Sequence, residues 1–242
     1  MPDRSTPPVI TCSDHAFFLD LDGTLAEIVA RPEQAMIADT MKDLIRRLSV
    51  QTNGAVAVVS GRSLDDIDRL ISPLELPAAG SHGQELRGGG ADAVAPSGEI
   101  APDVVHIIAE FATQRGLLAE QKPGSVALHY RSAPEYEAEC KALIDGLVSG
   151  DDRYRAVHGK MVSELAQRAC DKGTAIAAFA KTAPFAGRTP VMVGDDVTDE
   201  DGFRMAQSLG GIGIKIGEGA TDASHRLPSI PAFAEWLADI LR

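Results

Sequence analysis

The chain has few cysteines, and they form no pattern. Cys12, Cys140 and Cys170 are widely separated and lack the spacing of a metal site or a redox motif. Disulfides persist in oxidising compartments, so three isolated thiols favour a reducing one. We therefore expect a cytoplasmic protein in which each cysteine is a packing residue.

Long apolar runs are also missing. No run approaches the roughly 20 apolar residues that a membrane-spanning helix needs, so no membrane partner is predicted. Residues 1–11 are polar and contain prolines, without the basic start and apolar centre of a signal peptide. We expect these residues to be a disordered lead.

Positive charge is scarce as well. The 242 residues include 23 basic and 35 acidic side chains, for a formal charge of −12, and no basic tract offsets the excess. A nucleic acid would meet a repulsive field and is not predicted as a partner. A small phosphorylated substrate would also be repelled, so local cations and a bound metal would have to reverse the potential at its site.

The most informative stretch is residues 17–24, Phe-Phe-Leu-Asp-Leu-Asp-Gly-Thr. An apolar run that stops at polar groups is typical of a buried parallel strand that carries functional residues at its carboxyl end. Residues two apart share a face of a strand, so Asp20 and Asp22 are expected to project toward one small volume. Two carboxylates that close repel each other unless a cation offsets them, and Mg²⁺ prefers such oxygen ligands. Gly23 permits a turn, and the Thr24 hydroxyl can donate to an anion.

A calcium loop or a plain acidic turn is the alternative for this stretch. An EF-hand loop requires further ligands and a closing glutamate, which residues 26–29 do not supply. Asp-x-Asp-Gly-Thr directly after an apolar strand resembles the first motif of the haloacid dehalogenase superfamily.

Three later segments also bring polar groups to predicted element ends. The β-branched run at residues 55–59 is followed by Ser60, a helix over residues 172–181 begins at Lys172, and a strand over residues 189–193 leads to Asp195 and Asp196. In a parallel sheet such groups gather beyond the carboxyl edge of the strands.

Each of these residues has an ordinary explanation when it is taken alone. Ser60 suits a turn, Lys172 a solvated helix start, and Asp195 with Asp196 the cap of the next helix. The joint order of acidic pair, hydroxyl, lysine and acidic pair, each at a predicted sheet edge, favours phosphoryl transfer instead.

The strand and helix alternation is interrupted once. A flexible stretch over residues 88–98 precedes an α+β segment of two helices and four strands, after which the alternation returns. We predict an α/β fold: a Rossmann-like haloacid dehalogenase core with a parallel sheet, formed by residues 1–95 and 167–242, and an inserted α+β cap domain at residues 96–166. An insert at this place in the chain, after the motif with Ser60 and before the motif with Lys172, resembles the second cap class of that superfamily.

The four-motif order resembles that of the haloacid dehalogenase phosphatases over most of the chain. The resemblance implies that Asp20 is the phosphorylated nucleophile and Asp22 the general acid and base. It also implies that Ser60 and Lys172 hold the phosphoryl group. Mg²⁺ would be bound by Asp20, the backbone carbonyl of Asp22 and Asp195, with Asp196 and Asp199 as candidates behind these ligands.

The cap resembles that of the trehalose-6-phosphate phosphatases in Glu120-Gln121-Lys122, in His129-Tyr130-Arg131 and in residues 159–164. This resemblance implies that Glu120, Lys122 and Glu164 bind sugar hydroxyls, although Glu120 and Lys122 alone would suit an exposed strand face. Carboxylates accept hydrogen bonds from hydroxyls and ammonium groups donate to them.

Two further residues of the core are expected near the site, and the sequence departs from the family pattern at one place in the cap. Arg62 is expected near the catalytic edge as a substrate-binding residue, whereas His82 is left outside the catalytic set as a local hydrogen-bonding residue. After Glu164 the family usually has Arg-Pro, but this chain has Leu165-Ala166-Gln167.

The resemblance implies a Mg²⁺-dependent phosphatase that converts trehalose 6-phosphate to trehalose and phosphate through an aspartyl phosphate. A phosphatase for sucrose phosphate or a mannosyl phosphoglycerate is the alternative enzyme. A phosphosugar-binding sensor without turnover is the alternative from another class.

Overall fold

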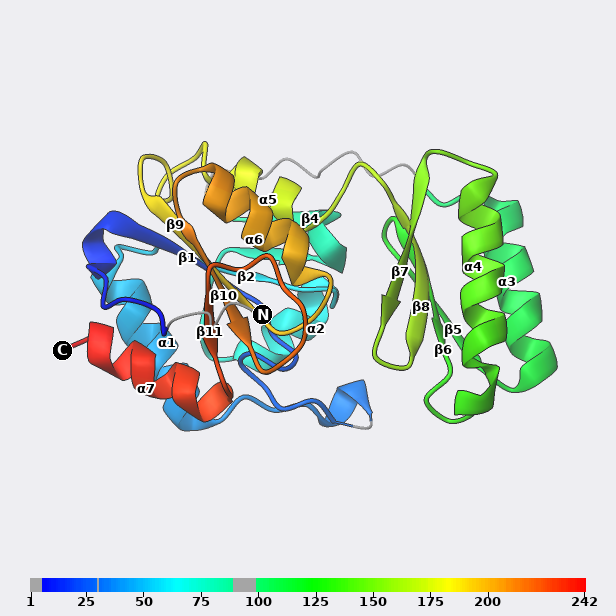
Figure 1. Cartoon of the computed structure of the whole chain (residues 1–242), viewed down its shortest axis with the longest axis horizontal. Helices are drawn as coiled ribbons and strands as arrows, with labels where there is room; N and C mark the ends of the chain where they lie inside the picture. Colours follow the sequence, from blue (N-terminus) through cyan, green and yellow to red (C-terminus); the bar gives the residue numbers. More distant parts are fainter. Residues whose placement is uncertain (1–5, 30, 89–98) are drawn as a thin grey trace. The chain divides into compact units, whose positions relative to one another are not determined.

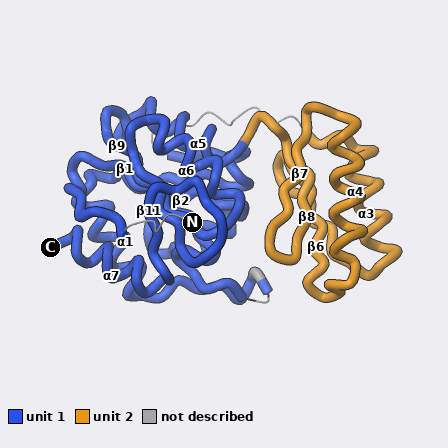
Figure 2. Tube along the Cα trace, viewed as in Figure 1, with its two compact units in different colours: residues 1–94, 171–242 blue, residues 95–170 orange. Residues whose placement is uncertain are grey.

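The structure is a computed structural model that describes residues 6–29, 31–88 and 99–242. The chain divides into two compact units, which Figure 2 distinguishes by colour. Unit 1 comprises residues 1–94 and 171–242, and unit 2 comprises residues 95–170. The flexible stretch expected at residues 88–98 lies outside the described residues, except for Gly88.

Unit 1 is built on a seven-stranded sheet in the order β11-β10-β9-β1-β2-β3-β4. All neighbouring strands are parallel except β3 and β4, so the sheet is mixed only at that edge. The strands are β1 (His15–Leu19), β2 (Val56–Val59), β3 (Ala78–Gly80), β4 (Glu85–Arg87), β9 (Thr189–Gly194), β10 (Ile212–Ile216) and β11 (His225–Leu227).

Helices cover both faces of this sheet (Figure 1). In β1, Phe17 and Leu19 pack with α1, α2 and α7, while Ala16 and Phe18 pack with α5 and α6. Burial on both faces explains why the central strands are apolar at every position. The helices are α1 (Asp39–Gln51), α2 (Leu64–Ile71), α5 (Lys172–Phe179), α6 (Asp199–Ser208) and α7 (Ile230–Ile240).

Unit 2 is an antiparallel sheet in the order β5-β6-β8-β7, and two helices lie side by side on one of its faces (Figure 1). Its core joins Val126, Leu128 and Leu165 of the sheet with Ile108 and Ile144 of the helices. The elements are α3 (Pro102–Arg115), β5 (Leu118–Lys122), β6 (Ser125–His129), α4 (Glu137–Ser149), β7 (Tyr154–Gly159) and β8 (Val162–Gln167). Within the described residues, no helix combines the length and apolar character needed to span a bilayer.

The expected α/β core with an inserted α+β unit is confirmed, and two details differ. The edge strands β4 and β11 were not expected, because each has three residues and no apolar run marks it. The second detail is Asp39: aspartate is a common N-cap residue, but here Ala38 is the N-cap, and Asp39 is the first helical residue of α1 and makes no side-chain cap bond. The part of the chain that the structure describes also has four short 3-10 segments: η1 (Cys12–Asp14), η2 (Pro32–Gln34), η3 (Ser81–Gly83) and η4 (Pro134–Tyr136).

The expected disordered lead is wrong for its described part. The indole N–H of Trp236 in α7 donates to the Pro8 carbonyl at 3.1 Å, and Pro7 and Cys12 are buried. An indole N–H beside an apolar helix requires a partner, and the lead supplies it. All three cysteines are buried and free, as expected of packing residues.

Candidate active site

The carboxyl edge of the unit 1 sheet collects the polar groups. Strand β1 pairs in parallel with β2 on one side and β9 on the other. Asp20, Ser60 and Asp195 each follow one of these three strands directly. The register therefore brings residues from the two ends of the sequence to one edge, near the middle of the sheet (Figure 1).

Lys172 lies between two aspartates at this edge. Its ammonium donates to Asp20 Oδ1 and to Asp199 Oδ1, both at 2.6 Å, and all three side chains are buried. The lysine is the first residue of α5, where Asp171 and Thr174 form a reciprocal capping box. Because the cap fixes the helix start, it also fixes the position from which Lys172 reaches Asp20.

The charges in this cluster do not balance without a further cation. Burial and the nearby carboxylates of Asp199 and Asp195 raise the pKa of Asp20 well above its ordinary value, although Lys172 opposes this. Burial lowers the pKa of Lys172, but Asp199 and Asp20 outweigh it and the net pKa is raised. The lysine stays charged, and the excess negative charge is unfavourable at Asp20.

A candidate metal-binding group is formed by Asp20, Asp195 and Asp199. One carboxylate oxygen from each lies within 4.8 Å of the others. Asp195 also packs directly on Gly23, where a Cβ atom would lie 2.3 Å from its carboxyl carbon. Three clustered carboxylates and the raised pKa of Asp20 fit a hard divalent cation that takes oxygen ligands.

Asp199 has a larger part in this arrangement than the sequence indicated. Its Oδ1 accepts from Lys172, and its Oδ2 accepts from the backbone N–H of Asp196 at 2.9 Å. It is completely buried, whereas Asp196 is partly exposed. Asp199 thus links the lysine to the turn that carries Asp195.

Asp22 and Ser60 are both engaged by Arg62. The guanidinium donates to Asp22 through Nε at 2.6 Å and through a terminal nitrogen at 2.7 Å, a two-point ion pair. The Arg62 backbone N–H donates to Ser60 Oγ at 3.2 Å. His82, with a φ of +55°, lies with its ring against Gly61. Arg62 therefore orients Asp22, a contact that sequence spacing does not reveal.

The expected sugar-binding residues share one face of the unit 2 sheet. Glu120 in β5 and Glu164 in β8 both pair with Ala127 in β6, so they lie in one row, and Lys122 is two residues from Glu120. The Glu120 carboxylate is 2.9 Å from His129 Nε2 and 3.4 Å from the Lys122 ammonium. The contact with His129 is the main cause of the lowered pKa of Glu120.

Two residues that contact the candidate site residues are not indicated by the sequence motifs. The motif His129-Tyr130-Arg131 does not by itself indicate a role for His129, and sequence spacing does not indicate one for Lys215 in β10, although a lysine in the otherwise apolar stretch Ile212–Ile216 is an anomaly. The Lys215 ammonium donates to the Asp195 backbone carbonyl. A charged residue at the end of a buried strand is the signal that could have found it.

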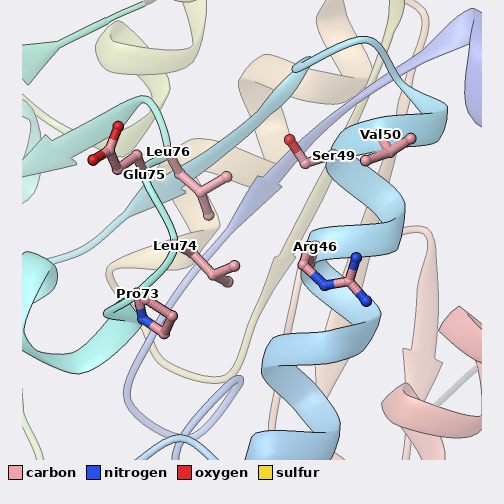
Figure 3. Close-up of a pocket in the computed structure, with 7 residues that line it drawn as sticks. All are labelled: Arg46, Ser49, Val50, Pro73, Leu74, Glu75 and Leu76. Carbon is pink, nitrogen blue, oxygen red and sulfur yellow. The ribbon is translucent and has the colours of Figure 1, made fainter.

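A pocket lies in unit 1, at the end of the sheet opposite to the carboxyl ends of the strands (Figure 3). It is formed by the end of α1 and the loop that leads into β3, at the amino ends of the strands. The catalytic candidates follow the carboxyl ends, so this pocket is separate from them. Its lining residues are Arg46, Ser49, Val50, Pro73, Leu74, Glu75 and Leu76.

The sheet order and the inserted unit define the class of the protein as the haloacid dehalogenase fold. A haloacid dehalogenase-like hydrolase from B. subtilis has this fold, with a TM-score of 0.68, 13% identity and coverage of 93% of this chain and 99% of that one.

The family follows from the comparisons of sequence. The model of the trehalose-phosphatase family matches residues 18–230, so the chain belongs to this family. The trehalose-6-phosphate phosphatase of Escherichia coli K12 is 42% identical over 226 residues, which are 92% of this chain and 85% of that protein. A probable trehalose-phosphate phosphatase of Sinorhizobium fredii is 39% identical over 229 residues, 93% of this chain and 86% of that protein.

A solved structure agrees in fold. The C-terminal domain of the C. albicans trehalose-6-phosphate phosphatase has a TM-score of 0.81 and 20% identity, and the match covers 95% of this chain and 92% of that domain. The family predicted from the sequence motifs is therefore confirmed.

Proposed function

We propose that this protein hydrolyses trehalose 6-phosphate to trehalose and phosphate in a Mg²⁺-dependent reaction. The observation that carries the proposal is the buried cluster of Asp20, Lys172 and Asp199 beside Asp195, in a chain of the trehalose-phosphatase family. This cluster provides a carboxylate nucleophile next to a fixed ammonium group, and phosphoryl transfer requires both a nucleophile and a cation that stabilises the phosphoryl oxygens.

The first half-reaction forms an acyl phosphate on Asp20. A carboxylate oxygen of Asp20 bonds to phosphorus as the bond between phosphorus and the sugar oxygen breaks, and Asp22 gives its proton to that oxygen. Lys172 and Ser60 donate to the phosphoryl oxygens. In the second half-reaction, Asp22 takes a proton from water, the water oxygen bonds to phosphorus, and the bond to Asp20 breaks to release phosphate.

Asp20, Asp195 and the backbone carbonyl of Asp22 are the proposed ligands of Mg²⁺, with Asp199 behind them. When bound, Mg²⁺ offsets the charge of the carboxylates and of the phosphoryl group. The oxygen-only donor set supports Mg²⁺ rather than a softer metal.

Arg62 is proposed to have two functions at the site. It holds the Asp22 carboxylate through two hydrogen bonds in the structure, which keeps this group oriented in the deprotonated form that takes a proton from water. Its guanidinium is also the proposed contact for the phosphorylated end of the substrate, since arginine matches phosphate geometry.

Unit 2 is proposed to recognise the sugar through Glu120, Lys122 and Glu164. Their shared face supports this, because a row of fixed charged groups can exchange hydrogen bonds with the hydroxyls of a disaccharide.

The enzyme is proposed to work in the reducing cytoplasm, which the three buried free thiols support. The substrate is a small sugar phosphate, and the excess of acidic residues argues against nucleic acid as a partner.

Phosphate release from trehalose 6-phosphate, compared with other sugar phosphates, tests the proposal. We expect turnover of trehalose 6-phosphate with Mg²⁺, loss of turnover with a chelator, and activity near background for Asp20→Asn. Preferred turnover of sucrose phosphate or a mannosyl phosphoglycerate would replace the substrate. Tight binding without turnover would indicate a sensor, and substantial activity in Asp20→Asn would remove Asp20 as the nucleophile.

A further inference from the structure

Lys215 is a buried cation that the proposed reaction does not use. It lies in β10 with a relative exposure of 4%, and its neighbours in the strand are Ile214 and Ile216. Among the described residues no carboxylate forms an ion pair with it, and its ammonium donates to the backbone carbonyl of Asp195. Burying an ammonium group without a direct ion pair is costly, so a lysine here requires a specific explanation.

Lys215 contacts the peptide group between Asp195 and Asp196. The carbonyl of Asp195 and the N–H of Asp196 belong to the same peptide plane. Lys215 donates to the carbonyl, and Asp199 Oδ2 accepts from the N–H at 2.9 Å. Both polar ends of this peptide are therefore held by buried side chains, which restricts its rotation.

The register of the sheet explains how Lys215 reaches this peptide. Lys215 in β10 is paired with Gly194 in β9, the residue that precedes Asp195. Gly194 leaves room for Asp199, whose carboxyl carbon would be 2.2 Å from a Cβ atom there. The lysine and the aspartate thus approach the turn from two elements, β10 and α6.

We propose that Lys215 is a positioning residue for the divalent cation: by holding the Asp195–Asp196 peptide opposite Asp199, it sets the direction of the Asp195 carboxylate. This inference rests on the proposed metal dependence. The carboxylate lies against Gly23 and within 4.8 Å of Asp20 and Asp199, so a small rotation of the peptide would change the distances among the three oxygens.

Charge and position have opposite effects, which makes the inference testable. The charge of Lys215 alone repels a divalent cation, so its removal would tighten metal binding. The hydrogen bond of Lys215 organises a proposed ligand, so its removal would weaken metal binding, and supporting contacts of this kind are typically worth about 10- to 100-fold in affinity. We infer that the positional effect is the larger.

The test is Mn²⁺ binding to the phosphate-free enzyme, measured from the electron paramagnetic resonance signal of free Mn²⁺. We expect Lys215→Met to bind Mn²⁺ at least about tenfold more weakly than the wild type, and Lys215→Arg to restore most of the affinity. The matched control is Lys42→Met. Lys42 also donates to a backbone carbonyl, that of Ser72 at 2.5 Å, but in α1. It should leave Mn²⁺ affinity unchanged.

Each other outcome has a defined meaning. Unchanged or tighter Mn²⁺ binding in a folded Lys215→Met protein would overturn the inference while leaving the proposed function intact. Lower thermal stability of Lys215→Met with unchanged affinity would assign Lys215 a purely structural role and also overturn it. Failure of the wild type to bind Mn²⁺, together with chelator-resistant turnover, would instead overturn the proposed metal dependence.

Discussion

At the scale of single residues, Gly23 and Asp195 form a close contact at the site. Gly23 has a φ of +87°, and an added Cβ atom would lie 2.3 to 2.5 Å from the Asp195 carboxylate. The backbone at Gly23, near the start of the sequence, therefore packs directly against the carboxylate of Asp195, which lies far later in the sequence. A side chain at this position would displace Asp195 as well as strain the backbone.

Gly23→Ala should reduce Mn²⁺ affinity and turnover by at least about tenfold, because the methyl group would push the Asp195 carboxylate away. The matched control is Gly187→Ala, which has a similar φ of +78° but no atom within 4 Å of the added Cβ. Both variants should lose about 1 kcal/mol of stability from backbone strain. Equal Mn²⁺ affinity of the two variants would contradict this account.

Asp20 is expected to reduce the stability of the metal-free protein. Its pKa in the folded state is raised by burial and by Asp199, so its contribution to stability is largest below the unfolded pKa and falls as pH rises through the folded pKa. Asp20→Asn, without metal, should therefore unfold at a higher temperature than the wild type near neutral pH, and the difference should shrink in acid.

Thermal unfolding in chelator across a pH series measures this effect. Saturating Mg²⁺ should raise the melting temperature of the wild type more than that of Asp20→Asn, because the cation offsets the same carboxylates. A metal-free wild type that is the more stable protein at neutral pH would rule the explanation out.

At the scale of elements, the unit 2 sheet presents two unlike faces. One face packs on α3 and α4, and the other carries Glu120, Lys122 and Glu164. His129 belongs to the second face through its contact with Glu120. This contact, which also lowers the pKa of Glu120, holds the carboxylate in one direction.

His129→Phe should raise the KM for trehalose 6-phosphate while leaving kcat little changed, because it removes a hydrogen bond to a proposed sugar ligand and not to the phosphoryl group. His129→Gln, which keeps a donor, should recover part of the loss. A small aryl phosphate provides the control substrate, and equal increases in KM for both substrates would count against a role in sugar recognition.

The elements also indicate what sequence reasoning can and cannot predict. The central strands were predictable because both of their faces are apolar. The placement of four polar residues at element ends was also predictable, because a polar residue directly follows an apolar run or begins a helix: Asp20, Ser60, Lys172 and Asp195. The bidentate bond of Arg62 to Asp22 and the reach of Lys215 to Asp195 were not, because they depend on register between strands. The three-residue edge strands carry too little pattern to be recognised.

At the scale of the whole molecule, the two units have separate hydrophobic cores. Ile45 lies in the core of unit 1 and Ile144 in that of unit 2, and both are fully buried. Truncation of either isoleucine to alanine should cost about 2 to 5 kcal/mol in its own unit.

The two truncations should differ in function. Ile144→Ala should impair hydrolysis of trehalose 6-phosphate more than that of a small aryl phosphate, because unit 2 is the proposed sugar-recognition unit. Ile45→Ala should reduce both activities in parallel. Steady-state kinetics with the two substrates, at a temperature near the onset of unfolding, measures the difference, and the same pattern for both variants would contradict separate contributions of the units.

The place of β1 between β2 and β9 has a consequence for biosynthesis. His15 pairs with Thr189 and Leu19 with Val193, so the central strand emerges from the ribosome long before the segment that covers its second edge. Unit 2, whose described strands pair with one another, is complete earlier. We expect the inserted unit to acquire protease resistance first on the nascent chain, because β1, the strand that Asp20 follows, gains its second neighbour only when the last third of the polypeptide has been made.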